Sequence, residues 1–178
     1  MQKSMTASIA LGWLLLGVPA LADVVESTPA GFTAKTVVDV AAPSTRVYQA
    51  LTDRIGSWWD QAHTYSGNAA NLSIDARPGG CFCERLPGGG GVNHLTVIYA
   101  EPGKLLRLSG GLGPLQDLAV SGVMSWKLTE STGKTTIEVT YKVSGYMPGA
   151  SGVGALAGPV DSVLTAQVKR LAEFVSTH

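Results

Sequence analysis

The C-terminal segment constrains the fold of this chain most, because its hydrophobic period differs from that of everything before it. From Pro159 onward apolar residues recur at helical spacing, and proline suits the first turn of a helix. The apolar positions are Val160, Val163, Leu164, Val168, Leu171 and Val175. These residues predict an amphipathic helix whose apolar stripe must be buried against another element.

The segments before this helix alternate apolar and polar residues with a period of two, which indicates strands with one buried face. They cover residues 32–42, 72–77, 81–85, 92–100, 104–109, 120–128 and 136–143. After the first of them, Pro43 to Asp53 predicts a short helix, and Ile55 to Trp59 predicts a second. The sequence therefore predicts an α+β architecture, in which a curved antiparallel sheet of about seven strands wraps around the long C-terminal helix.

The composition limits both the number of domains and the class of partner. A chain of 178 residues, 45% of them hydrophobic, can bury one core but is too short for two ordinary domains. Its 13 basic residues are balanced by 13 acidic ones and form no run, so no nucleic-acid partner is expected. Residues 23–178 are predicted to form a single domain with a neutral or weakly charged partner.

The N-terminus has the features of a signal peptide. Lys3 precedes an apolar stretch from Ala7 to Val18, and Ala20-Leu21-Ala22 matches the small-x-small pattern of a cleavage site. We predict a signal peptide over residues 1–22, cleavage after Ala22, and export to the periplasm without stable membrane insertion. A retained anchor helix is the alternative.

Several short motifs accompany this order of elements. They are the proline-started helix Pro43 to Asp53, the pair Trp58-Trp59, the pattern Arg77-x-Gly79-Gly80-x-Phe82-x-Glu84, the turn Glu101-Pro102, and Pro159 to Asp161. Together they resemble the START-like or SRPBCC superfamily, which has the helix-grip fold. The local matches are most similar to bacterial homologues of the activator of the heat-shock-protein-90 ATPase and to polyketide cyclase-like proteins. The resemblance implies an apolar cavity between sheet and long helix, and it implies no cofactor. An ATPase-activator role conflicts with export, because that chaperone is cytosolic, and no other protein partner is predicted.

Glu84 is the main candidate for chemistry. If Phe82 and Glu84 share the buried face of their strand, the carboxyl group points into an apolar cavity, where desolvation favours a group that exchanges protons. The alternative is a structural ion pair with Arg85, Arg107 or Lys104. In the strand over residues 92–100, strict alternation places Leu95, Val97 and Tyr99 on one face and His94, Thr96 and Ile98 on the other.

Cys81 and Cys83 admit three interpretations. Two residues apart in an extended strand, their Cα atoms lie about 6.6–7 Å apart, at the upper edge of disulfide geometry. They could form a strained redox-active pair, a metal half-site with His94 or His63, or buried thiols that pack as small hydrophobes. Buried thiols are the favoured interpretation, and no metal site is predicted.

Two functions follow as hypotheses. The first is a binding protein for a small hydrophobic molecule of lipid, polyketide or aromatic type, and it is favoured because only one titratable group clearly points inward. Its expected wall residues are Trp58, Trp59, Phe82, Glu84, Met124, Trp126, Tyr141, Leu164 and Val168. The second is an enzyme of cyclase or dehydratase type, with Glu84 as general acid or base and His94 or Tyr99 as helper.

Overall fold

A single antiparallel sheet forms most of the computed structural model, which describes residues 21–178. The sheet order is β1-β2-β8-β7-β6-β5-β4-β3, and all neighbouring strands run antiparallel. The strands are β1 Leu21–Thr28, β2 Gly31–Val40, β3 Leu72–Ile74, β4 Cys81–Arg85, β5 Gly91–Glu101, β6 Leu105–Gly110, β7 Ala119–Ser131 and β8 Lys134–Tyr146. The helices are α1 Ser44–Asp53, α2 Ile55–Trp58 and α3 Ala157–Thr177. Short 3-10 turns include η1 Gln61–His63 and η4 Gly113–Asp117.

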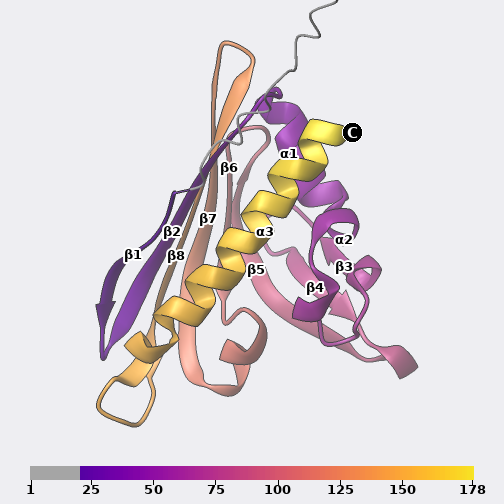
Figure 1. Ribbon diagram of the computed structural model, residues 1–178. Helices are drawn as coiled ribbons and strands as arrows, with labels where there is room; N and C mark the ends of the chain where they lie inside the picture. The colour runs from indigo at the N-terminus through magenta and orange to yellow at the C-terminus, as the bar shows by residue number, and fades with distance from the viewer. Residues whose placement is uncertain (1–20) are drawn as a thin grey trace, which may run out of the picture.

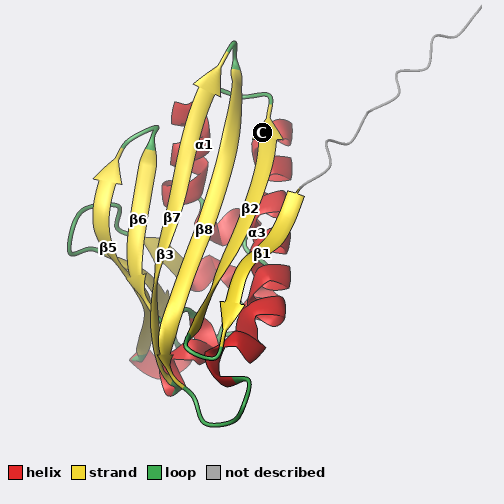
Figure 2. Ribbon diagram, turned by 90° about the vertical axis from the view of Figure 1, so that its left-hand side faces the viewer, coloured by secondary structure: helices red, strands yellow, loops and turns green. Residues whose placement is uncertain are grey.

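The long helix α3 runs along one face of this sheet, and α1 and α2 lie on the same side (Figures 1 and 2). This is the α+β, helix-grip arrangement that the sequence predicts. Leu164, Val168, Leu171 and Val175 of α3 are all buried, so the helical stripe faces the core. Burial of each such side chain contributes about 1.5–3 kcal/mol, which makes this stripe a principal attachment of helix to sheet.

One strand exceeds the predicted seven. β1 pairs with β2, for example Val24 with Ala34, and extends the sheet at its edge. It begins at Leu21, just before the predicted cleavage point after Ala22, so cleavage there leaves most of the strand in place. Residues 1–20 of the predicted signal peptide lie outside the described residues. Within residues 21–178, none of the helices is sufficiently long and apolar to cross a bilayer.

The prediction for the faces of β5 is wrong at two positions, because β5 carries two β-bulges. Phe82 of β4 pairs with Leu95, but Cys83 pairs with Asn93, so His94 is an extra residue in β5. A bulge interrupts the alternation of faces, and as a result both His94 and Leu95 are buried. A period of two could not place these side chains on the same side.

The second bulge turns Tyr99 away from the core. Val97 pairs with Leu108, whereas Tyr99 pairs with Arg107, which leaves Ile98 as the extra residue. Tyr99 is 43% exposed, and the Arg107 guanidinium lies 5.7 Å from the centre of its ring. The predicted helper role of Tyr99 inside a cavity is therefore wrong.

The two cysteines form a disulfide, so the prediction of buried free thiols is wrong. Their Cα atoms are 5.3 Å apart, closer than a fully extended strand allows and within the ordinary range for disulfides. The register of β4 against β5 also shifts between Phe82 and Cys83, within the segment that the disulfide closes. Both cysteines are half-buried, and they alternate with the buried Phe82 and Glu84. In the part of the chain described, no cluster of three or more His, Cys, Asp or Glu residues could hold a metal ion.

Candidate functional site

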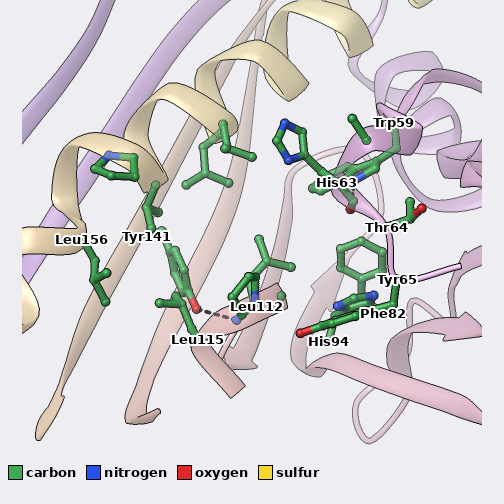
Figure 3. Close-up of a pocket in the computed structure, with 17 residues that line it drawn as sticks. Trp59, His63, Thr64, Tyr65, Phe82, His94, Leu112, Leu115, Tyr141 and Leu156 are labelled. Carbon is green, nitrogen blue, oxygen red and sulfur yellow. Dashed lines mark hydrogen bonds between the residues drawn. The ribbon is translucent and has the colours of Figure 1, made fainter. Parts of the chain in front are cut away.

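A cavity of about 340 Å³ lies between α3, the sheet and two loops (Figure 3). Most of the side chains around it are apolar or aromatic, which suits it to an apolar occupant. The lining residues are Trp59, Ala62, His63, Thr64, Tyr65, Phe82, His94, Leu112, Gly113, Pro114, Leu115, Tyr141, Leu156, Pro159, Val160, Val163 and Leu164.

Four of the predicted wall residues line this cavity, namely Trp59, Phe82, Tyr141 and Leu164. Another four are buried in the core but do not line it, namely Trp58, Met124, Trp126 and Val168. The two adjacent tryptophans differ because their indole N–H groups bind different partners. Trp58 donates to the Ala50 carbonyl and packs edge-on against Trp126, whereas Trp59 donates to the His63 carbonyl and packs against Phe82.

Sequence reasoning missed the wall contributed by two other segments. One is the start of α3, with Val160 and Val163 and the residue before the helix, Leu156, and the other is the turn over residues 112–115. Val160 and Val163 belong to the apolar stripe of the helix, so the sequence could have predicted that their side chains face the sheet and the cavity. The turn has no periodicity, and only its position in space brings it to the cavity.

Helix α3 also fixes the loop that follows α2. The buried Gln167 side chain accepts a hydrogen bond from the backbone N–H of Asp60, at 2.9 Å between heavy atoms. Arg170 donates to the Trp58 carbonyl, at 3.0 Å. These two bonds hold the backbone on either side of Trp59 against α3.

Glu84 lies behind the cavity wall and binds three donors. Its side chain is almost fully buried, with the residue 1% exposed. One carboxylate oxygen accepts the backbone N–H of Ser66 at 2.5 Å, and the other accepts the backbone N–H of Tyr65 at 3.1 Å. The second oxygen also lies 2.9 Å from Nε2 of His94. Glu84 therefore binds the loop that carries Tyr65 and orients the His94 ring. The predicted ion pair with Arg85, Arg107 or Lys104 does not form.

These hydrogen bonds determine the charge of Glu84. Burial by itself raises the pKa of the carboxyl group, but the hydrogen bonds from Ser66, Tyr65 and His94 outweigh it, and the pKa of Glu84 lies below its usual value. The carboxyl group is thus charged at neutral pH and acts only as an acceptor. This direction is the opposite of the raised pKa expected for a desolvated acid.

The lowered pKa predicts a loss of stability in acid. A carboxyl group with a lower pKa in the folded than in the unfolded state stabilises fully above the unfolded value of about 4.3, and this contribution is lost as the pH falls through the folded value. Between pH 5 and 3 we expect the free energy of unfolding to fall more steeply in the wild type than in the variant Glu84→Gln. Urea unfolding at several pH values measures both slopes. Glu101 and Glu130 also have a lowered pKa. Both are present in the wild type and in the variant, so their contribution to the pH dependence of stability cancels in the comparison. Equal slopes would contradict the assignment.

Tyr141 is the other polar side chain of the wall, and it has a structural role. Its hydroxyl donates to the Gly110 carbonyl at 2.8 Å and accepts the backbone N–H of Leu112 at 3.0 Å. Burial raises the pKa of Tyr141 to about 12, so the phenol stays neutral. It ties the end of β6 to the turn that forms one side of the cavity.

Comparison with known proteins supports the fold. No protein-family model matches the chain, and no curated protein matches it. Among solved structures, CalU16 from Micromonospora echinospora aligns with a TM-score of 0.54 and 16% identity, over 90% of this chain and 88% of that one. A conserved protein of unknown function, EF2215 from Enterococcus faecalis, aligns with a TM-score of 0.58 and 14% identity, over 88% of this chain and 77% of that one.

A third neighbour, DynU16, is a protein of the dynemicin biosynthetic locus. It aligns with a TM-score of 0.55 and 23% identity, over 82% of this chain. The alignment covers 47% of DynU16, so this chain spans about half the length of that protein. At these identities the likeness shows a shared fold.

Proposed function

We propose that this protein binds a small apolar molecule, of lipid, polyketide or aromatic type, in the cavity between the sheet and α3. The observation that carries the proposal is the cavity itself, whose volume of about 340 Å³ and largely apolar wall are those of small-molecule sites. The structural likeness to DynU16, a protein of the dynemicin biosynthetic locus, supports this choice of ligand. The signal-like N-terminus supports a periplasmic place of action.

Filling the cavity tests the proposal. Val160 lines it from α3, so the substitution Val160→Trp places an indole where the ligand is expected. The matched control is Ala166→Trp, at an exposed position of the same helix that does not line the cavity. The probe is N-phenyl-1-naphthylamine, an apolar dye that fluoresces in apolar sites.

We expect the wild type and Ala166→Trp to bind the dye equally, and Val160→Trp to bind it at least about tenfold more weakly, which corresponds to about 1.4 kcal/mol. Native mass spectrometry of protein purified from the periplasm would then identify a copurifying natural ligand. A wild type that binds no dye, or a Val160→Trp variant that binds as well as the control, would refute a ligand in this cavity.

A second function, proton-transfer catalysis of cyclase or dehydratase type, is favoured by the Glu84–His94 pair. A histidine oriented by a buried carboxylate is a common arrangement for a general base. In this arrangement His94 exchanges the proton and Glu84 is the positioning residue. Incubation of the copurified ligand with the wild type and with His94→Phe, followed by chromatography and mass spectrometry, tests this function through a product that only the wild type forms. A dehydration product is lighter by one water, and a cyclised product has the same mass but elutes at a different position.

A further inference from the structure

One nitrogen atom in the cavity wall lacks a hydrogen-bond partner. His94 is 4% exposed, and its Nε2 is paired with Glu84. Its Nδ1 is shielded from water and has no partner among the described residues. A buried acceptor without a donor costs free energy, so such an atom calls for an explanation.

The surroundings of the ring restrict where Nδ1 can find a donor. The Tyr65 ring stacks on His94 at 5.9 Å between centroids and 15° between planes, and the Phe82 ring lies 5.1 Å away. Figure 3 shows His94 beside Phe82 and Tyr65 at the wall of the cavity. With these rings against it and Nε2 turned to Glu84, the ring can offer a ligand only its remaining edge, which carries Nδ1.

The pairing with Glu84 also sets the chemical character of Nδ1. The carboxylate can only accept, so Nε2 carries the proton that lies between the two residues. In the neutral imidazole, Nδ1 then holds a lone pair and accepts a hydrogen bond. Tyr141 also lines the cavity, but its hydroxyl already donates to the Gly110 carbonyl.

We propose that the cavity selects flat aromatic molecules that carry a hydroxyl group, such as phenols and aromatic enols, and that His94 Nδ1 accepts the O–H of the ligand. The inference rests on the proposed function, since it assumes an apolar ligand in the same cavity. The aromatic skeleton packs against the rings of Trp59 and Phe82, which contact each other at 5.3 Å. Tyr65 lines the cavity and is 49% exposed, so it is the side chain over His94 with the most freedom to move aside as the hydroxyl enters.

Two ligands of nearly equal shape test the selection. 1-Naphthol has a hydroxyl donor, and 1-methoxynaphthalene carries an ether at the same position and no donor. By titration calorimetry at neutral pH we expect the wild type to bind 1-naphthol about tenfold more tightly, the usual effect of one buried hydrogen bond. In His94→Phe the preference for 1-naphthol over 1-methoxynaphthalene should fall to within about twofold.

The control is Tyr65→Phe, which keeps the stacked ring and removes the other hydroxyl near His94. We expect it to keep the tenfold preference. If His94→Phe does not fold, nitrogen NMR of the wild type gives the answer, because the Nδ1 resonance of His94 should move with 1-naphthol and stay in place with 1-methoxynaphthalene.

The possible failures are distinguishable. Equal binding of both naphthalenes by the wild type, an undiminished preference in His94→Phe, or an unresponsive Nδ1 resonance would overturn hydroxyl selection and leave an apolar-ligand function standing. Loss of the preference in Tyr65→Phe would show that the Tyr65 hydroxyl recognises the hydroxyl of the ligand, and it would overturn the assignment of this contact to His94. Binding of neither compound would overturn both this inference and the proposed function.

Discussion

Replacing Glu84 with alanine is expected to lower the free energy of unfolding by about 3–5 kcal/mol, because three hydrogen-bond donors lose one buried, charged acceptor. The carboxylate accepts the backbone N–H groups of Tyr65 and Ser66 and pairs with His94. An unpaired buried donor costs about 1–3 kcal/mol, and this applies in full to the buried His94, whereas the N–H groups of Tyr65 and Ser66 lie in a partly exposed loop and recover part of the cost from water. The substitution also releases the loop that carries Tyr65, so ligand affinity should fall with stability.

Urea unfolding followed by tryptophan fluorescence measures this effect. Glu101→Ala is the matched control, because Glu101 is a solvent-accessible carboxylate whose ion pair with Lys104 lies at the surface. Such pairs contribute about 0–1 kcal/mol, so this variant should remain close to the wild type. If the free energy of unfolding falls by the same small amount in both variants, Glu84 does not hold the loop that carries Tyr65 and Ser66.

Replacing Tyr141 with phenylalanine is expected to cost about 2 kcal/mol of stability, although it removes a single oxygen atom. That hydroxyl satisfies the carbonyl of Gly110 and the N–H of Leu112, and each group left unpaired costs about 1–3 kcal/mol before water compensates in part. Hydrogen exchange should accelerate over residues 111–118, where the turn loses its attachment to β8.

Tyr146→Phe provides the comparison for this experiment. It lies on the same strand, is 72% exposed, and should change stability by less than about 0.5 kcal/mol. Unchanged exchange at Leu112 in Tyr141→Phe would show that the turn is held by other contacts and that the hydroxyl is dispensable.

The parts of the fold that the sequence predicts well are those in which one periodic pattern decides the outcome. Val168 and Leu171 of α3 and Ile137 and Val139 of β8 lie at the positions their spacing indicates, because burial of a continuous apolar face dominates the energetics of a helix or a strand. The same reasoning places Phe82 and Glu84 together on the buried face of β4.

The candidate site depends on features that no periodic pattern contains. His94 reaches the inner face through a β-bulge, and a bulge is determined by the pairing of β5 with β4, not by the residues of β5 alone. The partners of Glu84 are backbone groups of residues 65 and 66, whose approach depends on the path of an irregular loop. Sequence reasoning could select Glu84 and His94 as candidates, but it could not show that the histidine is the group with a free nitrogen.

The spacing of Cys81 and Cys83 has a consequence for how the protein folds. Because one residue separates them, their bond can form in the unfolded chain without any long-range search, and it closes a loop of only three residues. The chain-entropy relation gives such a loop about 1.6 kcal/mol of stabilisation, against about 3 kcal/mol for a loop of 15 residues. The disulfide therefore gives the sheet little global stability. Its main effect is local, since it restricts the backbone of Phe82 before the strands on either side have assembled.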